Sequence, residues 1–380
     1  MASRREFLST SGLSVIAALG AGAATAAAQN PGKKRDGAAA TAPLWIDGLA
    51  VPGGIDPEKG PGPLTPQHLL DLRNSGLTAV NVTVSDVGNA ADAFETTLFG
   101  IADQEREIAQ HPAQLLKIRS AADLQLAREK QMLGLIYGFQ DSSPIGYDLK
   151  RLAMFQGLGV RIVQLTYNNR NLCGDGCLEP SDGGVSRFGL EVIDELARLK
   201  IVLDLSHASP RTMEQAIARC KNPALISHTA CRDLVDRPRN TYDRVLRQLA
   251  DKGGVAGIYF MPFLRESGQP TGEDLLRHIE HALKVCGEDH VSIGTDGFVS
   301  PPLLDDAYRK AHREFVESRR KKGIFSAGED AEVLNLVPEY NRVDRFHHLA
   351  EQLQQRGYAA ARIDKILGLN LARVMGEVWG

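Results

Sequence analysis

Two histidines and an aspartate stand directly after three separate apolar runs of the chain. His207 follows Ile-Val-Leu-Asp-Leu-Ser, His228 follows Ala-Leu-Ile-Ser, and Asp296 follows Val-Ser-Ile-Gly-Thr. Two imidazoles and a carboxylate form a ligand set that proteins use for zinc. A histidine alone after a strand is more often a hydrogen-bonded loop residue. The prediction of a metal site therefore depends on a fold that brings all three residues to one place.

Short apolar or β-branched runs alternate with segments of helical periodicity, which indicates the fold that would do this. Predicted helices open at Thr65-Pro66, at Ser209-Pro210 and at Thr271. The alternation predicts a parallel sheet, and eight units close into a (β/α)8 TIM barrel, an α/β fold whose active sites lie at the C-terminal ends of the strands. The eight predicted strands are Leu44–Gly48, Thr78–Val84, Gly134–Phe139, Arg161–Thr166, Ile201–Ser206, Ala224–Ser227, Val255–Met261 and Val291–Thr295.

The first 43 residues have a different character. Arg4-Arg5, followed by Phe7-Leu8, leads into an Ala/Gly-rich run that ends near Ala28. We predict a twin-arginine signal peptide over residues 1–28, a flexible leader over 29–43 and one barrel domain over 44–380. Because the apolar run is diluted by Gly, Ser and Thr, we expect cleavage, export to the periplasm and no membrane span in the mature form. An uncleaved anchor is the alternative.

Charge and cysteine content narrow the expected partners and the expected cross-links. A net charge of -3 gives no reason to expect nucleic acid or an anionic membrane as partner. Five cysteines in an exported chain leave at least one unpaired. Cys173 and Cys177 are close enough in sequence to form a disulfide across a tight turn, although so short a loop often misses the geometry that a disulfide requires. The sequence leaves both alternatives open, a Cys173–Cys177 disulfide and two free thiols.

Several segments resemble the membrane (renal) dipeptidase family, peptidase M19, whose members are metal-dependent hydrolases. The resemblance implies His207 and His228 as ligands of one zinc ion and Asp296 as the residue that handles the attacking water. It also implies that Arg239 binds the substrate carboxylate, with Asn240 beside it as a further substrate-binding residue. As family members commonly do, the chain is expected to pair with itself. The segments that carry it are Ile201–His207, Pro223–His228, Arg237–Asn240, Gly254–Phe260, His290–Gly297 and the tail around Arg356–Asn370.

Four positions depart from the family pattern. Leu49 and Val51 replace the His and Asp that hold the first metal, and Gln140 replaces the glutamate that bridges the two metals. Tyr167 replaces a histidine that steadies the oxyanion. We therefore predict one zinc ion in preference to two, with an empty site as the alternative, and Gln140 as a substrate contact. Tyr167 is interpreted either as an oxyanion donor or as a packing aromatic.

The sequence thus predicts a divergent hydrolase that acts on a dipeptide or a related small carboxylated amide. A non-catalytic binding or accessory protein on the same scaffold is the main alternative. A dinuclear dipeptidase with Asp56 or Asp141 as a replacement ligand is the third. A charged helical insertion is predicted at about 305–340, with Arg319-Arg320-Lys321-Lys322. Such a run is usually a solvated face, and otherwise a lid or a dimer contact.

Overall fold

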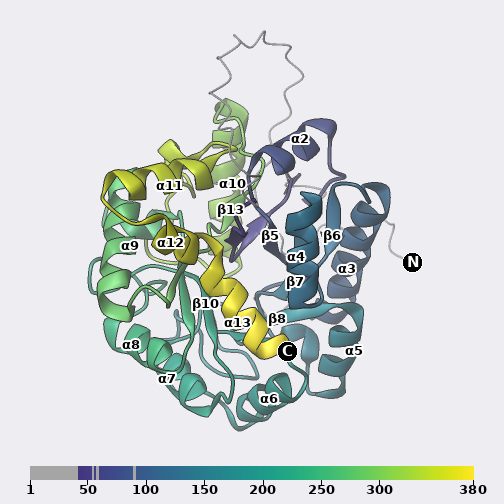
Figure 1. Ribbon diagram of the computed structural model, residues 1–380. Coiled ribbons are helices and arrows are strands. Elements are labelled where there is room, and N and C mark those ends of the chain that lie inside the picture. The colour runs from purple at the N-terminus through teal and green to yellow at the C-terminus, as the bar shows by residue number, and fades with distance from the viewer. Residues whose placement is uncertain (1–41, 54, 57–59, 89–90) are drawn as a thin grey trace, which may run out of the picture.

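The chain folds into a nearly closed barrel of eight parallel strands, as the computed structural model shows (Figure 1). The structure describes residues 42–380 except 54, 57–59 and 89–90, so the predicted signal peptide and almost all of the leader lie outside it. Each strand pairs with the next along the chain. The predicted fold class is confirmed, and all eight predicted strands form. They are β1(Ile46–Asp47), β5(Ala79–Thr83), β7(Leu133–Phe139), β8(Val160–Gln164), β9(Val202–Asp204), β10(Leu225–Thr229), β11(Val255–Ile258) and β12(Val291–Ile293).

The last strand meets the first through two hydrogen bonds. The Gly48 amide donates to the Ile293 carbonyl at 2.9 Å, and the Thr295 amide donates to Asp47 Oδ1 at 2.8 Å. These bonds place the residues that follow β12 beside those that follow β1. Asp296 and the substituted residues Leu49 and Val51 are therefore neighbours in space.

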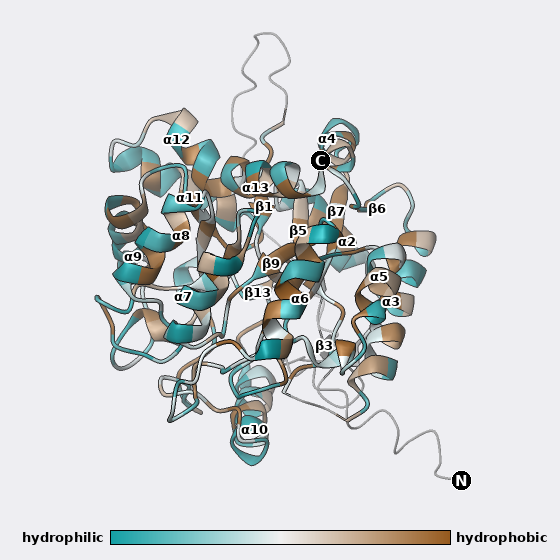
Figure 2. Ribbon diagram, turned by 90° about the horizontal axis from the view of Figure 1, so that it is seen from below, coloured by the Kyte–Doolittle hydropathy of each residue, from teal (hydrophilic) through white to brown (hydrophobic). Residues whose placement is uncertain are grey.

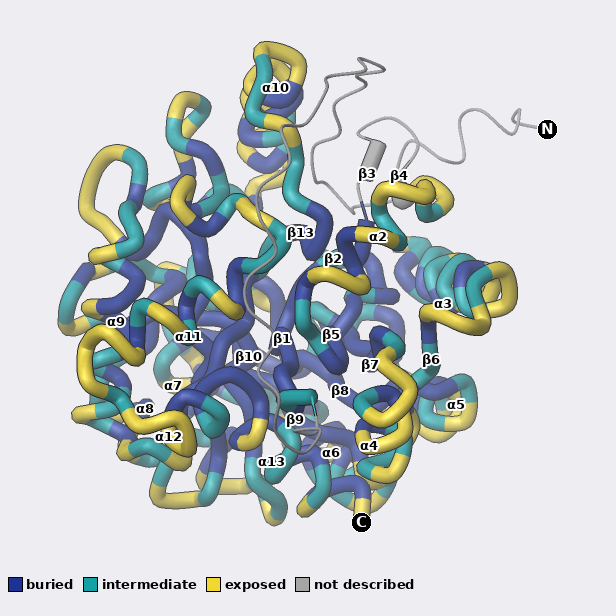
Figure 3. Tube along the Cα trace, turned by 45° about the horizontal axis from the view of Figure 1, so that its top comes forward, coloured by how far each residue is buried: buried dark blue, intermediate teal, exposed yellow. Residues whose placement is uncertain are grey.

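Helices surround the strands on the outside of the barrel (Figure 1). Apolar residues of the helices face the strands (Figure 2), while exposed residues gather on the outer helix surfaces (Figure 3). Among the described residues, no helix combines the length and apolar character that a membrane span requires. The helices are α2(Pro66–Asn74), α3(Ala93–Gln110), α4(Ala121–Lys130), α5(Lys150–Leu158), α6(Arg187–Arg198), α7(Pro210–Arg219), α8(Asp243–Asp251), α9(Gly272–Cys286), α10(Asp306–Lys321), α11(Arg345–Gln355), α12(Ala360–Asp364) and α13(Asn370–Trp379), with short turns η1(Ser143–Ile145), η2(Pro262–Leu264), η3(Pro338–Tyr340) and η4(Lys365–Leu369).

The predicted capping residues begin the helices as expected. The Thr65 hydroxyl accepts a hydrogen bond from the His68 amide at 3.2 Å, and Pro66 occupies the first turn of α2. Ser209 caps α7, and Thr271 forms a capping box at the start of α9. Side chains that satisfy free amides at a helix start are therefore reliable local signals in this sequence.

Some short strands were not predicted. β6(Leu115–Lys117) pairs with the start of β7, on the edge opposite β5. β3(Ile55–Asp56) pairs antiparallel with β4(Gly60–Pro61). More important for the site, β2(Ala50–Val51) pairs in parallel with β13(Gly297–Phe298). This small sheet forms part of one end of the barrel and brings the segments after β1 and β12 together.

All five cysteines are free thiols, so the disulfide alternative is wrong. The Cys173 sulfur accepts a hydrogen bond from Ser142 Oγ at 3.1 Å, whereas Cys177 Sγ donates to Asn168 Oδ1 at 3.4 Å. The two thiols therefore have separate partners on either side of the turn.

Candidate active site

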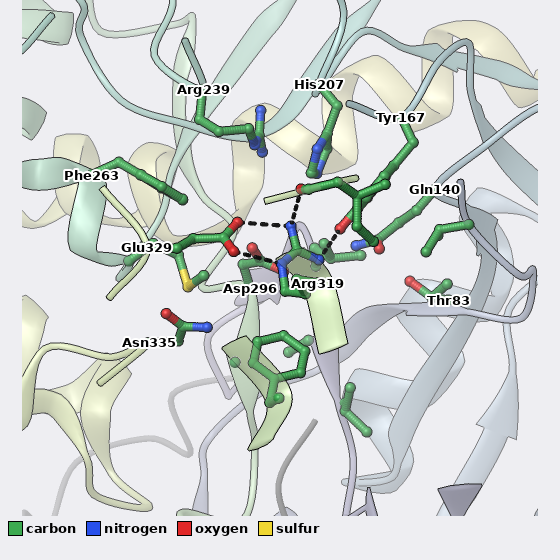
Figure 4. Close-up of a pocket in the computed structure, with 18 of the residues that line it drawn as sticks. Thr83, Gln140, Tyr167, His207, Arg239, Phe263, Asp296, Arg319, Glu329 and Asn335 are labelled. Atoms are coloured by element: carbon green, nitrogen blue, oxygen red, sulfur yellow. Dashed lines mark hydrogen bonds and ion pairs between the residues drawn. The ribbon is translucent and has the colours of Figure 1, made fainter. Parts of the chain in front are cut away.

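A cavity of about 1090 Å³, counting the solvent at its mouth, lies at the C-terminal ends of the strands (Figure 4). One part of its wall is apolar, because Leu49 and Val51 line it together with side chains from β13, α10 and the segment after it. The other part carries the ionisable groups, which are His207, Arg239, Asp296, Arg319 and Glu329. The structure thus brings most of the predicted site residues to one place.

His207, after β9, and His228, in β10, point their Nε2 atoms at each other across 2.8 Å. Both residues are buried, with 4% and 0% of their surface exposed. The Nδ1 atom of His207 lies 2.6 Å from Asn168 Oδ1, and the Nδ1 atom of His228 lies 2.8 Å from Ser227 Oγ. Each ring is therefore held at its outer nitrogen, so that its inner nitrogen faces the other ring.

The hydrogen-bond network decides which nitrogens carry protons. Asn168 Nδ2 donates to the Ile324 carbonyl at 2.7 Å, so Asn168 Oδ1 must accept from His207 Nδ1. Ser227 Oγ donates to Asp204 Oδ2 at 2.5 Å, so this oxygen accepts from His228 Nδ1. Both Nε2 atoms then present lone pairs to one another. Rings oriented in this way by groups behind them are typical of a pair that holds a cation.

Asp296 stands at the turn after β12 with its carboxylate free. Its backbone amide donates to the Leu49 carbonyl at 2.8 Å, and its φ is 55°. Within the described part of the chain, no group donates a hydrogen bond to its carboxylate. Burial raises its pKa to about 6, although the charges of Arg239 and Arg319 act in the opposite direction. His207 also has a positive φ, of 66°, so both candidate site residues occupy a strained backbone conformation.

Arg239 and Asn240 have different roles, although they are neighbours in sequence. Arg239 lines the cavity, is 3% exposed, and its buried Nη2 has no hydrogen-bond partner. Asn240 Nδ2 donates to the carbonyls of Val235 at 2.7 Å and Phe263 at 3.0 Å, and its Oδ1 accepts from the Tyr259 hydroxyl. The amide of Asn240 is thus fully used, and Asn240 does not line the cavity, so it holds the loop that carries Arg239. A substrate contact for it stays a prediction.

Tyr167 and Arg319 form a connected pair in the middle of the cavity (Figure 4). The Tyr167 ring stacks on His207 with 4.1 Å between ring centroids, and its hydroxyl accepts a hydrogen bond from Arg319 Nη1 at 3.0 Å. Arg319 in turn donates to both carboxylate oxygens of Glu329, at 2.7 and 2.8 Å. Burial raises the pKa of Tyr167, so the phenol keeps its proton.

The model of the membrane dipeptidase family, peptidase M19, matches residues 68–309 of this chain. The chain belongs to this family. Its relatives include a dipeptidase of Clonostachys rogersoniana, named verJ, which is 30% identical over 226 residues, 58% of this chain and 49% of that protein. An uncharacterized dipeptidase of Schizosaccharomyces pombe is 34% identical over 190 residues, 48% of this chain and 46% of that protein. The chain spans about half the length of these two relatives.

A crystal structure of an amidohydrolase from Pseudomonas aeruginosa resembles the whole barrel. The two structures superpose with a TM-score of 0.76 and 33% sequence identity, over 89% of this chain and 97% of that one. Membrane dipeptidases are metallopeptidases, so family membership suggests a metal cofactor for this chain. Which metal centre can form depends on the side chains that line the cavity.

The donor set does not fit the two-metal centre of a membrane dipeptidase. Leu49 and Val51 face the cavity with hydrocarbon, and the amide of Gln140 reaches it without a charge. In the ranges that the structure describes, no group of three His, Cys, Asp or Glu side chains converges as a metal centre. Asp141 does not replace a ligand, because Gly88, Ser143 and Asn171 donate hydrogen bonds to it. The side chain of Asp56 lies outside the described part of the chain.

The two imidazoles do fit one ion. Zinc binds imidazole nitrogens at about 2.0 Å, so two such nitrogens in a tetrahedral shell lie about 3.3 Å apart. The observed separation of 2.8 Å is therefore about half an ångström shorter than zinc requires, which a small rotation of either ring supplies. His207 and His228 can act as two ligands of one ion, with the remaining positions left to water or substrate.

Arg319 and Glu329 are the site residues that sequence reasoning missed. The run Arg319–Lys322 was interpreted as a solvated face, and this is wrong for Arg319, which is only 8% exposed, although the next three residues are exposed. The signal that would have found Arg319 is its spacing along α10. The buried residues of this helix are Tyr308, Ala311, His312, Val316 and Arg319, so the arginine lies on the inward stripe.

Proposed function

We propose that the protein hydrolyses a dipeptide or a related small amide that carries a free carboxylate. The observation that carries this proposal is the buried Nη2 of Arg239, which faces the cavity without a partner. A buried guanidinium N–H without an acceptor is costly, and a carboxylate satisfies it with a charge-assisted hydrogen bond. Asp296, with a carboxylate that no donor occupies, lines the same cavity. The site therefore offers a grip for an anion and a base for a water molecule.

The reaction follows from these positions. Asp296 accepts a proton from water as the oxygen of that water adds to the amide carbonyl, and the hydroxyl of Tyr167 donates to the resulting oxyanion. Asp296 then returns the proton to the leaving nitrogen as the carbon–nitrogen bond breaks, which yields an amine and a carboxylic acid. Gln140, directly after β7, contacts the substrate, and the apolar wall around Leu49 accepts a side chain. One zinc ion held by His207 and His228 would supply a water molecule of lowered pKa.

The test is turnover by the purified protein on a panel of dipeptides and N-acyl amino acids, with product amines quantified by mass spectrometry. Arg239→Met is expected to raise KM by about 100-fold, because a charge-assisted bidentate contact is lost. Arg237→Met is the matched control, since Arg237 donates to the Glu266 carbonyl and does not line the cavity. A substrate whose carboxylate is converted to a carboxamide should bind the wild type as weakly as the parent binds Arg239→Met. Equal turnover of the carboxylate and the carboxamide would refute the proposal.

A non-catalytic binding protein is the second candidate, favoured by the apolar and neutral residues at the first metal site. Elemental analysis of protein purified without chelator separates the two, with His207→Ala as the control. About one zinc ion per chain, together with hydrolysis, supports the hydrolase. Absence of zinc and of turnover, together with a raised melting temperature in the presence of dipeptides, supports the binding protein.

We also propose that the protein acts in the periplasm. This depends on the Arg4-Arg5 motif and the Ala/Gly-rich run behind it. Fractionation of cells that carry the Arg4→Lys/Arg5→Lys variant tests it, because twin-arginine export requires the pair. Wild-type levels of the variant in the periplasm would rule out this route.

A further inference from the structure

We infer that Arg319, a residue of the inserted helix α10, is a catalytic group that binds the oxyanion together with Tyr167. This inference rests on the proposed hydrolysis and adds a residue outside the segment 68–309 that the family model matches. Glu329 is the positioning residue, because it holds the guanidinium from behind. The oxygen that these groups recognise is the negatively charged oxygen of a tetrahedral intermediate formed from an amide.

The hydrogen bonds of Arg319 leave one donor free. A guanidinium has five N–H groups. Nε donates to Glu329 Oε2, and Nη2 donates to Glu329 Oε1 and to the Ile324 carbonyl, at 2.7, 2.8 and 3.1 Å. Nη1 donates once, to Tyr167 Oη at 3.0 Å. Four of the five groups are thus used, and the fifth is the second hydrogen of Nη1, on the side of the guanidinium that carries the Tyr167 phenol.

The hydroxyl of Tyr167 is a second hydrogen-bond donor without an acceptor among the described residues. Its oxygen accepts from Arg319, so its own O–H is available to donate, and no acceptor for it is found in the described ranges. Two donors therefore sit next to each other at the centre of the cavity, one of them on a full positive charge (Figure 4). Paired donors that are fixed before the reaction are the usual means of stabilising an oxyanion.

The Arg319 guanidinium supplies positive charge to the part of the cavity where the first metal would lie. The resemblance to membrane dipeptidases implies a first metal held from positions 49 and 51, and in this chain both residues are apolar. The insertion places a guanidinium at the same cavity, where its charge acts on both Asp296 and His207. The Glu329 carboxylate fixes the guanidinium with two hydrogen bonds, so the donor is rigid.

The experiment measures kcat and KM for one double variant and for a matched control. Arg319→Gln/Glu329→Gln removes both members of the ion pair, so that no carboxylate is left buried alone. Arg320→Gln removes the next charge along the same helix, where the side chain is exposed. We expect kcat to fall by about 100-fold or more in the double variant, with KM changed far less, and no change in Arg320→Gln. A folded double variant with kcat within about threefold of the wild type, or with its loss entirely in KM, overturns the inference.

Chemical rescue of kcat distinguishes a catalytic role of Arg319 from a purely structural one. In Arg319→Ala, Glu329 remains to bind a small cation, so methylguanidinium is expected to restore part of kcat, while methylammonium, which lacks the planar donors, restores less. Arg320→Ala serves as the control that neither cation affects. Failure of methylguanidinium to raise kcat in a folded Arg319→Ala variant counts against the catalytic role.

Failure of the proposed function is recognised separately, because then the wild type itself turns over no amide. The inference is in that case tested by calorimetry with a phosphinate analogue of a dipeptide and with the planar dipeptide itself. We expect the Arg319 variants to lose affinity for the phosphinate, whose oxygens mimic the oxyanion, by about 100-fold more than for the dipeptide. Equal losses for the two ligands, or none, would overturn the assignment of Arg319.

Discussion

Asp47, at the end of β1, should make the stability of the barrel fall as the pH rises from about 4 to about 6. The residue is 1% exposed, and its carboxylate accepts hydrogen bonds from the Thr295 amide at 2.8 Å, the Thr295 hydroxyl at 2.7 Å and the Leu49 amide at 3.2 Å. Burial nevertheless raises its pKa from 3.8 to about 6. The folded protein therefore holds this proton over a range in which the unfolded chain releases it.

The magnitude follows from the size of that shift. The difference between 6 and 3.8 is 2.2 pKa units, and at 1.36 kcal/mol per unit this is about 3 kcal/mol. The stabilisation of the folded state by the proton on Asp47 is fully present below the unfolded pKa of 3.8. It is lost as the pH rises through about 6 and does not change above that. Arg345, the nearby cation that favours the ionised form, stays charged throughout because its own pKa is about 10.

The assay compares the free energy of unfolding in urea of the wild type and Asp47→Asn from about pH 4 to about pH 8. Asparagine has the same shape and does not titrate, so ionisable groups that do not interact with Asp47 cancel in the difference. Asp296, whose pKa the charge of Asp47 raises, is replaced by asparagine in both proteins so that it does not titrate in the same window. We expect the wild type to lose about 3 kcal/mol relative to the variant across the window. A difference that is constant with pH, or that changes in favour of the wild type as the pH rises, would show that the hydrogen bonds outweigh the cost of burial.

Further substitutions test the barrel and the site. Asp296→Asn should lower kcat by about 100-fold or more, while the variant is still stabilised by a dipeptide, and retention of kcat would exclude a general base at this position. Gly257→Ala should cost about 3 kcal/mol of stability in urea unfolding, because the added Cβ would lie 2.0 Å from the Ser227 carbonyl oxygen. Gly157→Ala is its control, since nothing lies within 4 Å of that Cβ, and an equal loss there would contradict the steric argument. Alkylation under denaturing conditions without reductant should modify five thiols per chain, and fewer would indicate a disulfide.

The strands were predictable because each is a short buried run with a local signature. Residues 134–139 are apolar or glycine, residues 161–166 are apolar or β-branched except for Arg161 and Gln164, and β7 and β8 form there, as expected for strands enclosed by helices. That His207 and Asp296 reach one cavity followed from the fold class, since parallel strands in a barrel end on one side. His228 lies behind His207, and the described residues do not form the expected ligand set of two histidines and an aspartate. Local sequence and topology were therefore sufficient to predict the strands and the end of the barrel at which the site lies.

Side-chain partners inside the cavity were not predictable in the same way. Asn240 was expected to contact substrate, but its amide donates to the carbonyl of Val235 in its own loop and to that of Phe263 in η2. The second of these bonds depends on how the segments after β10 and β11 meet. Arg319 forms an ion pair with Glu329, ten residues away, across a turn that sequence alone does not specify. Charge composition indicates that a segment is polar, whereas only the folded segment decides which of its charges point inward.

The charge balance of the cavity makes a prediction about metal and ligand together. Arg239 and Arg319 contribute two positive charges and Asp296 and Glu329 two negative charges, so the cavity is neutral while its histidines are neutral. The positions of two carboxylate ligands of the family carry valine and glutamine, so a dication here adds two charges that no side chain offsets. An anionic ligand such as an N-acyl amino acid would offset part of them. Zinc and that ligand should therefore bind cooperatively, each raising the affinity of the other by the same factor. Chelator competition with and without an N-acyl amino acid measures this factor, and a zinc affinity that the ligand leaves unchanged would contradict the electrostatic argument.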